Sequence, residues 1–287
     1  MKTEQKLTVG LVMKSLQADF FKDMQQGAET YAAQQNRFKL LSTGTNSQTE
    51  IEQQITIVNR LVEQNVDAIV VVPIDSKALV PPVVKAIKKG ITVVNIDIRL
   101  DEQMLQSEGI DLTYVGPDNF TASQTVGKEL SKLLDKGDKV FLIEGLPVAE
   151  NAQQRKAGFE SAISEAGLYL AESVPANWET DTAEEIFATL YKKHPDVKGV
   201  FCCNDAMALG VINALKSQGV KPGIIPVVGF DNDTAMQPYL SEGWLLATID
   251  AYGSQMAVEG IRYAIQIIDG LPSGGIHKTP FSLIKRK

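Results

Sequence analysis

An α/β fold with two similar halves, each built on a parallel sheet, is predicted by two observations. Short apolar, β-branched segments alternate with segments of helical periodicity along nearly the whole chain. The halves also repeat one another: ITVVNIDI at 91–98 and IPVVGFD at 225–231 both place an Asp just past a strand, and DAIVVVP at 67–73 and VKGVFCCN at 197–204 precede them by comparable distances. Because ligands bind beyond the carboxyl ends of parallel strands, we expect the strand ends of both halves to surround one central cleft.

The first half opens with LTVGLVM at 7–13, an apolar run that predicts a buried strand. A polar connection at 14–19 leads into a helix that runs from Phe20 to Gln35, with apolar and small residues at helical spacing. Pro81 and Pro82 cannot lie inside a helix, so a later helix is expected to begin near them. The same reasoning predicts strands at 38–42, 67–72, 91–96 and 112–116, a helix capped by Ser47 or Thr49 that ends at Glu63, a helix that ends at Lys89, and a polar surface segment at 100–109.

The second half repeats this order of elements. Pro195 ends one of its helices, and no Pro- or Ser-rich linker separates the halves, so short crossings are expected to join them. Strands are predicted at 140–143, 168–174, 197–202, 225–230 and 245–249, helices at 121–134, 149–166, 182–193, 204–218, 235–242 and 254–269, and a tail at 270–287.

Composition and charge exclude several classes of protein. The chain has 287 residues, 44% of them hydrophobic, and a formal net charge of −7, so it lacks the basic surface that non-specific nucleic-acid binding needs. No apolar run approaches the roughly 20 residues that span a bilayer. No signal peptide is expected, since 1–6 leads directly into the first strand, and the compartment stays open. The only cysteines, Cys202 and Cys203, are predicted to be packing residues without a disulfide.

The sequence contains few motifs that are typical of enzymes. There is no Walker loop, no Rossmann glycine fingerprint and no nucleophile elbow, so no nucleotide cofactor is expected. His194 and His277, the only histidines, lack neighbours at metal-ligand spacing, and both are expected to be structural or solvated. Asp97 and Asp231 remain candidates for a carboxylate pair of the kind that glycoside hydrolases use.

Polar side chains at the predicted strand ends, with aromatic rings nearby, suit an uncharged, hydroxyl-rich ring or chain. Carboxylates and Asn accept hydrogen bonds from hydroxyls, while Arg and Lys donate them. The candidates are Lys14, Asp97, Arg155, Asn204 and Asp231, with Phe20, Phe21 and Trp178 as flat walls. Each set has a structural alternative: Phe20 and Phe21 as core residues, Asp97, Asn204 and Asp231 as helix caps, and Arg155 as a solvated side chain.

The runs KSLQADFFKDMQQGAE, KKGITVVNIDIR, QQRKAGF, VPANW, FCCNDAMALG, VVGFDND and LLATID together resemble periplasmic sugar-binding proteins of the ribose/allose type, the solute-binding components of ABC transporters. The resemblance implies two Rossmann-like lobes, each a parallel sheet flanked by helices, joined by a three-stranded hinge (periplasmic binding protein type I). The lobes would be 1–116 plus 252–281 and 117–251 plus 282–287, with crossings near 116–118, 250–252 and 281–282. It also implies a non-catalytic, extracytoplasmic monomer without a cofactor, which traps one sugar by hinge closure and delivers it to a membrane permease.

The resemblance also assigns the site, position by position. Phe20 and Phe21 in one lobe and Trp178 in the other would be stacking walls. The residues that would bind hydroxyls are Asp97, Arg155, Asn204 and Asp231, with Lys14 as in the allose-like branch. The chain departs from the family pattern at Ala18 and Asp19, at Ile98, and at Ala251, beside which Asp250 joins the candidate site. Three hydroxyl partners are thereby lost or replaced, so another pentose or hexose, a deoxy sugar or a sugar alcohol becomes an alternative to ribose and allose.

Three other functions share parts of this pattern. The effector core of a LacI-type repressor has the same architecture, as does the ligand-sensing module of a receptor. A carboxylate-based glycosidase is the enzymatic alternative, and turnover of chromogenic glycosides would reveal it.

Overall fold

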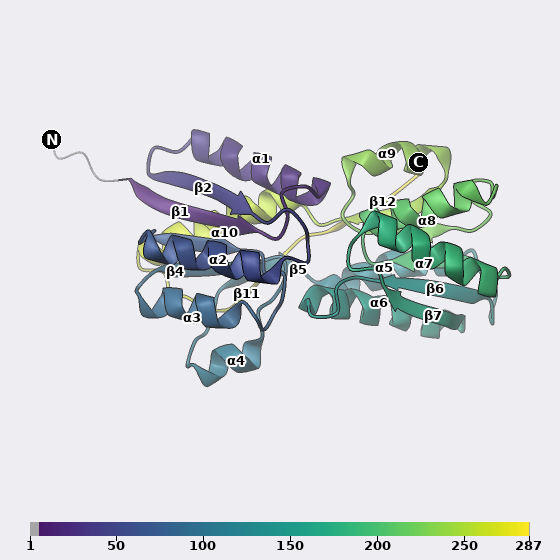
Figure 1. Ribbon diagram of the computed structural model, residues 1–287, viewed down its shortest axis with the longest axis horizontal. Coiled ribbons are helices and arrows are strands. Elements are labelled where there is room, and N and C mark those ends of the chain that lie inside the picture. The colour runs from purple at the N-terminus through teal and green to yellow at the C-terminus, as the bar shows by residue number, and fades with distance from the viewer. Residues whose placement is uncertain (1–5, 287) are drawn as a thin grey trace. The chain divides into compact units, whose positions relative to one another are not determined.

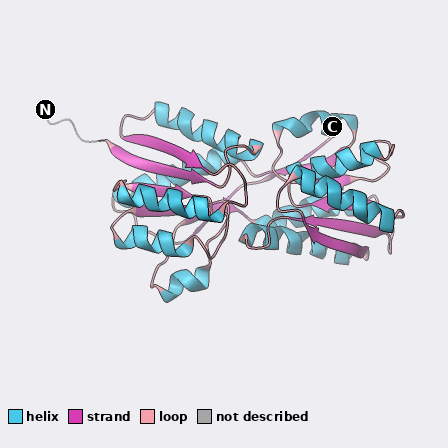
Figure 2. Cartoon of the chain, viewed as in Figure 1, coloured by secondary structure: helices cyan, strands magenta, loops and turns pink. Residues whose placement is uncertain are grey.

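The computed structural model describes residues 6–286 (Figure 1). The chain divides into two units, the first comprising the described residues of Met1–Gly116 with Val148–Glu150 and Tyr252–Thr279, and the second Pro117–Pro147, Asn151–Ala251 and the described residues of Pro280–Lys287. These units differ from the expected lobes at residues 148–150 and 280–281. In both, strands alternate with helices along the chain (Figure 2), which confirms the predicted α/β class.

The first unit contains, among its described residues, a six-stranded sheet in the order β11-β5-β4-β3-β1-β2. Strands β1 to β5 pair in parallel. The strands are β1 (Leu7–Met13), β2 (Phe38–Gly44), β3 (Ala68–Val71), β4 (Thr92–Ile96), β5 (Tyr114–Pro117) and β11 (Ile276–Thr279). The helices are α1 (Asp19–Ala33), α2 (Ile51–Glu63), α3 (Val80–Lys88), α4 (Glu102–Ser107) and α10 (Gly253–Ile268). Helix α1 packs against α10, and α2 packs against α3 (Figure 1).

The second unit repeats this order with the strands β12-β10-β9-β8-β6-β7. Among the described residues, β6 to β10 pair in parallel, and β10 pairs with β12 in the antiparallel direction. The strands are β6 (Lys139–Glu144), β7 (Tyr169–Pro175), β8 (Gly199–Cys202), β9 (Val227–Val228), β10 (Leu245–Asp250) and β12 (Ser282–Lys285). The helices are α5 (Asn119–Ser131), α6 (Glu150–Ala166), α7 (Thr180–Lys193), α8 (Asp205–Ser217) and α9 (Gln237–Glu242), preceded by a 3-10 turn at Thr234–Met236. The equivalent strand orders confirm the predicted repeat.

Buried strands and close helix contacts hold each unit together. Every residue of β3 (AIVV) is inaccessible to solvent, as expected for a central parallel strand. In the second unit the rings of Phe159 and Phe201 meet edge to face at 5.4 Å, a favourable aromatic geometry. Helices α5 and α6 approach so closely that a Cβ on Gly158 would lie 2.4 Å from the Phe120 carbonyl oxygen. This contact brings the beginning of α5 against the middle of α6.

Two segments contain elements that the sequence analysis did not predict. Residues 100–109 lie mostly at the surface, as expected, but they include α4, which Asp101 caps by accepting a hydrogen bond from the Met104 amide. The tail at 270–287 contributes β11 and β12, each at the edge of a different sheet. Their pairing partners are distant in sequence, so no local pattern reveals them. Within residues 6–286, no helix has both the length and the hydropathy that crossing a membrane requires.

Candidate functional site

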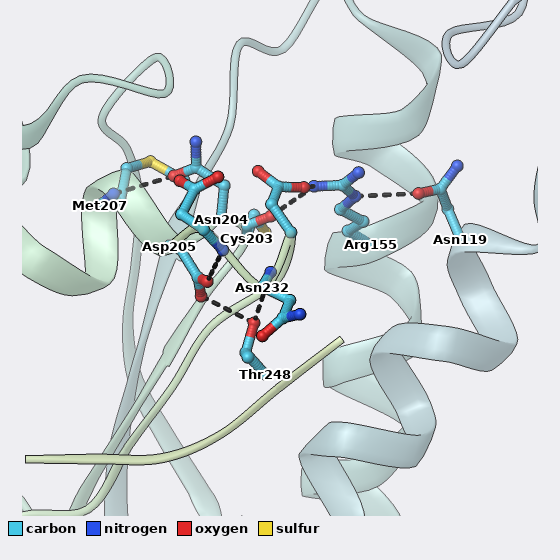
Figure 3. A network of polar contacts seen from close by, with 10 residues as sticks. Asn119, Arg155, Cys203, Asn204, Asp205, Met207, Asn232 and Thr248 are labelled. Atoms are coloured by element: carbon cyan, nitrogen blue, oxygen red, sulfur yellow. Dashed lines mark hydrogen bonds and ion pairs between the residues drawn. The ribbon is translucent and has the colours of Figure 1, made fainter. Parts of the chain in front are cut away.

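Arg155 is the centre of a buried polar network in the second unit (Figure 3). Its side chain, on α6, is 3% exposed. Nε donates to Asn119 Oδ1 at 2.9 Å, while Nη1 donates to the Cys203 carbonyl at 2.9 Å and to Asp231 Oδ1 at 3.2 Å. The guanidinium carbon lies 3.5 Å from the centroid of the Phe230 ring. Since guanidinium keeps its charge in proteins, this is a buried, paired cation, and the solvated alternative for Arg155 was wrong.

Asp231 lies in a strained loop that follows β9. Its φ is 114° and that of Asn232 is 56°, conformations that L side chains rarely adopt. The Asp231 amide donates to the Ile249 carbonyl at 2.8 Å, which anchors the loop to β10. Asp250, at the end of β10, accepts from Asn232 Nδ2 at 3.1 Å. The next helical turn begins at Thr234 with Asp233 at its N-cap position, so Asp231 is not a helix cap.

A second buried carboxyl group, Asp205 at the beginning of α8, holds this loop through a hydrogen bond from the Asp233 amide. Its oxygens accept hydrogen bonds from Thr248 Oγ1 at 2.8 Å (Figure 3) and from the Asp233 amide at 3.0 Å. Burial, reinforced by the nearby charge of Asp231, raises the pKa of Asp205 from 3.8 to about 8. The two hydrogen bonds favour the ionised form, but burial outweighs them.

Asn204 does cap a helix, as its structural alternative predicted. Its Oδ1 accepts from the Met207 amide at 2.9 Å at the beginning of α8 (Figure 3). Among the hydrogen bonds of residues 6–286, none is donated by its Nδ2. Capping and ligand binding are compatible, because they would use different atoms of the same amide.

Trp178 is buried beside the network, with its ring 5.6 Å from the Arg155 guanidinium carbon. It follows β7, and both Asn177 and Trp178 have a positive φ, of 56° and 72°. Its ring occupies the space next to Gly145, where a Cβ would lie 2.1 Å from a ring carbon. The absence of a side chain at Gly145 therefore allows the indole to reach this position.

The first unit buries the aromatic and basic candidates together. Lys14, directly after β1, is 4% exposed, and its Nζ lies 5.4 Å from the centroid of the Phe21 ring. Phe20 and Phe21 meet edge to face at 5.2 Å. A Cβ on Gly253, at the beginning of α10, would lie 2.8 Å from the Phe20 ring. Packing therefore fixes both rings, as their core alternative predicted.

Asp97 follows β4 in the same sheet and is 2% exposed. Its φ is 64°, and its carbonyl accepts a hydrogen bond from the Tyr114 hydroxyl at 2.8 Å. Helix α4 is capped by Asp101, so Asp97 is not a cap. A buried carboxylate in a strained conformation at a strand end is the arrangement expected of a binding residue.

The other candidate groups have structural roles. Cys202 and Cys203 are buried and free, and burial raises the pKa of the Cys203 thiol to about 12. His194 contacts Glu172 at 3.1 Å, and His277 bonds the Tyr263 hydroxyl at 2.9 Å. In the described part of the chain, no cluster of three or more His, Cys, Asp or Glu residues could hold a metal ion.

Sequence reasoning missed Asn119 and Asp205 as members of the site. Asp205 directly follows Asn204, so its place at a strand end was a signal. Asn119 carried a weaker signal, because it comes just after a predicted strand but contacts Arg155 only through the packing of α5 on α6.

Comparison with known proteins adds the family. Residues 9–272 match the model of the periplasmic binding protein domain. The chain is 41% identical to the D-ribose/D-allose-binding protein of Pseudomonas aeruginosa, over 98% of this chain and 90% of that protein. It is 28% identical to the D-allose-binding periplasmic protein of Escherichia coli, over 93% and 85%.

Solved structures agree with this assignment. An ABC transporter solute-binding protein from Burkholderia multivorans, whose unknown ligand is represented as alpha-D-erythrofuranose, superposes with a TM-score of 0.95 at 40% identity, covering 98% of this chain and 100% of that one. A periplasmic solute-binding protein from Actinobacillus succinogenes with bound D-allose gives 0.92 at 30% identity, covering 98% of each. The chain belongs to the periplasmic binding protein family, in the group whose relatives are solute-binding proteins of ABC transporters.

Proposed function

We propose that this protein binds one monosaccharide or sugar alcohol between its two units and delivers it to the membrane permease of an ABC importer. Its relatives support this function, since they include a D-ribose/D-allose-binding protein at 41% identity and a D-allose complex at 30% identity. They support transport and not the repressor core. The proposal includes an extracytoplasmic location, a monomeric state and the absence of catalysis.

The observation that carries the proposal is that Arg155 is buried while the two N–H groups of its Nη2 make no hydrogen bond within residues 6–286. A guanidinium has five N–H donors, and three of those of Arg155 are used by Asn119, Cys203 and Asp231. Its Nη2 donates no hydrogen bond to any residue within 6–286. A buried cation with two open donors, beside an indole and a carboxylate, suits a hydroxyl-rich ligand.

The proposed contacts come from both units. In the second, Arg155, Asn204, Asp231 and Asp250 would bind hydroxyls, while the Trp178 ring would contact the apolar face of the sugar. In the first, Asp97 and Lys14 would bind hydroxyls and the edges of Phe20 and Phe21 would line the wall. Closure would follow because only the closed arrangement lets one ligand contact both sets.

Titration calorimetry and thermal unfolding against a panel of pentoses, hexoses and polyols test the function. We expect at least one compound, with D-ribose and D-allose as the first probes, to bind with one site per chain and to raise the melting temperature. If no sugar or polyol does so, the proposal is wrong. Chromogenic glycosides should stay intact in the same preparations.

Asp97→Asn tests the assignment of the first unit. The binding free energy of whichever sugar binds should weaken by about 2 kcal/mol or more, because an NH2 donor replaces one of the two accepting oxygens and the charge is lost. Asp67→Asn is the matched control. Asp67 accepts a hydrogen bond from the Thr8 amide at 2.7 Å and directly precedes β3, so it lies at the amino-terminal ends of the strands, whereas Asp97 lies at their carboxyl ends. Equal affinities for the two variants would remove Asp97 from the site.

A further inference from the structure

Asn119 is a buried amide whose placement no helix requirement explains. It is fully buried at the beginning of α5, yet the cap of that helix is Asp118, whose Oδ1 accepts from the Thr121 amide at 3.0 Å. The Asn119 oxygen faces Arg155 Nε at 2.9 Å (Figure 3). Its Nδ2 is buried without a hydrogen-bond partner among residues 6–286. Burying the Asn119 amide while its Nδ2 donates no hydrogen bond is unfavourable for folding. An asparagine at this position therefore calls for a functional explanation, and its contact with Arg155 offers one.

The contact determines which edge of the guanidinium is held. Nε bonds to Asn119 and Nη1 bonds to Cys203 and Asp231, so two of the three nitrogens are fixed. A planar fork held at two nitrogens has a defined orientation, and its Nη2 edge then points in one direction. If the Nε contact were lost, the guanidinium would keep only the Nη1 contacts and could turn about that nitrogen.

We propose that Asn119 is a positioning residue for ligand binding: it holds Arg155 so that the two Nη2 hydrogens face a ligand hydroxyl. This inference deepens the proposed function and rests on it. A preorganised donor binds more tightly because the ordering of the side chain does not oppose association. The cost of ordering one long side chain on binding corresponds to a loss of affinity of up to about tenfold.

Ligand-free protein gives the first test, by NMR of the arginine Nε–H groups in the whole chain. In the wild type, the Arg155 Nε–H should be rigid and slow to exchange with water. Asn119→Ala should make it mobile and faster to exchange, whereas Asn119→Asp, which keeps an oxygen at the contact, should restore its rigidity. Ser123→Ala is the control, because Ser123 is fully buried one turn later on α5 and its Oγ has no partner among the described residues. An Arg155 signal in Asn119→Ala that matches the wild type overturns the proposal.

Calorimetry with D-ribose and D-allose gives the second test. Asn119→Ala should weaken binding by up to about tenfold, because Arg155 must then be ordered when the ligand binds. Ser123→Ala should leave the affinity within about twofold, since the Ser123 hydroxyl makes no hydrogen bond with Arg155. In an Arg155→Lys background, which already lacks Nε, Asn119→Ala should have almost no further effect. An equal loss in both backgrounds would assign Asn119 a general structural role and overturn the proposal. If no sugar binds to the wild type, the proposed function fails, and the NMR comparison alone decides the role of Asn119.

Discussion

Removing the Arg155 side chain should destabilise the ligand-free protein severely. Arg155→Ala takes the donor away from two buried oxygens, Asn119 Oδ1 and the Cys203 carbonyl, and breaks the 3.2 Å ion pair with Asp231. The two side chains of this pair are only 3% and 9% exposed. Removing one partner of such a buried pair leaves an uncompensated charge, so we expect the free energy of unfolding to fall by about 3–5 kcal/mol.

Urea unfolding followed by tryptophan fluorescence measures this change cleanly. The chain has two tryptophans, Trp178 and Trp244, and both lie in the second unit, so the signal reports the unit that carries Arg155. Lys156→Ala is the matched control: Lys156 is the next residue of α6, and its ion pair with Glu144 at 2.9 Å involves a side chain that is 36% exposed. We expect that variant to lose at most about 1 kcal/mol. Equal losses for the two variants would refute the claim that Arg155 is a buried, paired cation.

Three further outcomes are expected. Because the pKa of Asp205 is raised in the folded state from 3.8 to about 8, the folded protein binds more protons than the unfolded chain between these values, and its stability falls as pH rises. Asp205→Asn lacks this titrating group. From pH 5 to 8 its free energy of unfolding should therefore rise relative to that of the wild type, by up to about 1.4 kcal/mol per pH unit. Urea midpoints of the two proteins that change in parallel over this range would contradict a raised pKa for Asp205. Gly145→Ala should displace the Trp178 ring, which a Cβ would approach to 2.1 Å, and shift its fluorescence to longer wavelength; an unchanged spectrum would show that the ring is not confined there. Cys202 and Cys203 are buried, and burial raises the pKa of both thiols. They should not react with a thiol-specific chromogenic disulfide at pH 8 until urea is added. Rapid reaction of the native protein would show that these thiols are accessible.

The order of elements and the repeat were predictable because they depend on local chemistry. β-Branched runs such as AIVV in β3 are typical of strands that a parallel sheet buries on both faces, and the two runs that end in Asp97 and Asp231 mark equivalent strands. The role of Asn204 as a cap was also open to local reasoning, since a cap needs only the amide three residues later.

Backbone strain and edge pairing were beyond local reasoning. The left-handed conformations of Asp97, Trp178 and Asp231 persist only because surrounding structure imposes them, so residue type does not announce them. The pairing of Ser282–Lys285 with β10 joins segments more than thirty positions apart.

Residue types and their spacing along this chain were enough to establish a doubly repeated α/β protein with polar and aromatic side chains at its strand ends. Whether Arg155 faces water or is buried between Asn119, Asp231 and an aromatic ring was settled by the packing of α5 on α6 and of α6 on the strand ends. The physical reason is that periodicity records which face of an element is apolar, whereas a hydrogen bond between distant residues exists only after whole elements have come together.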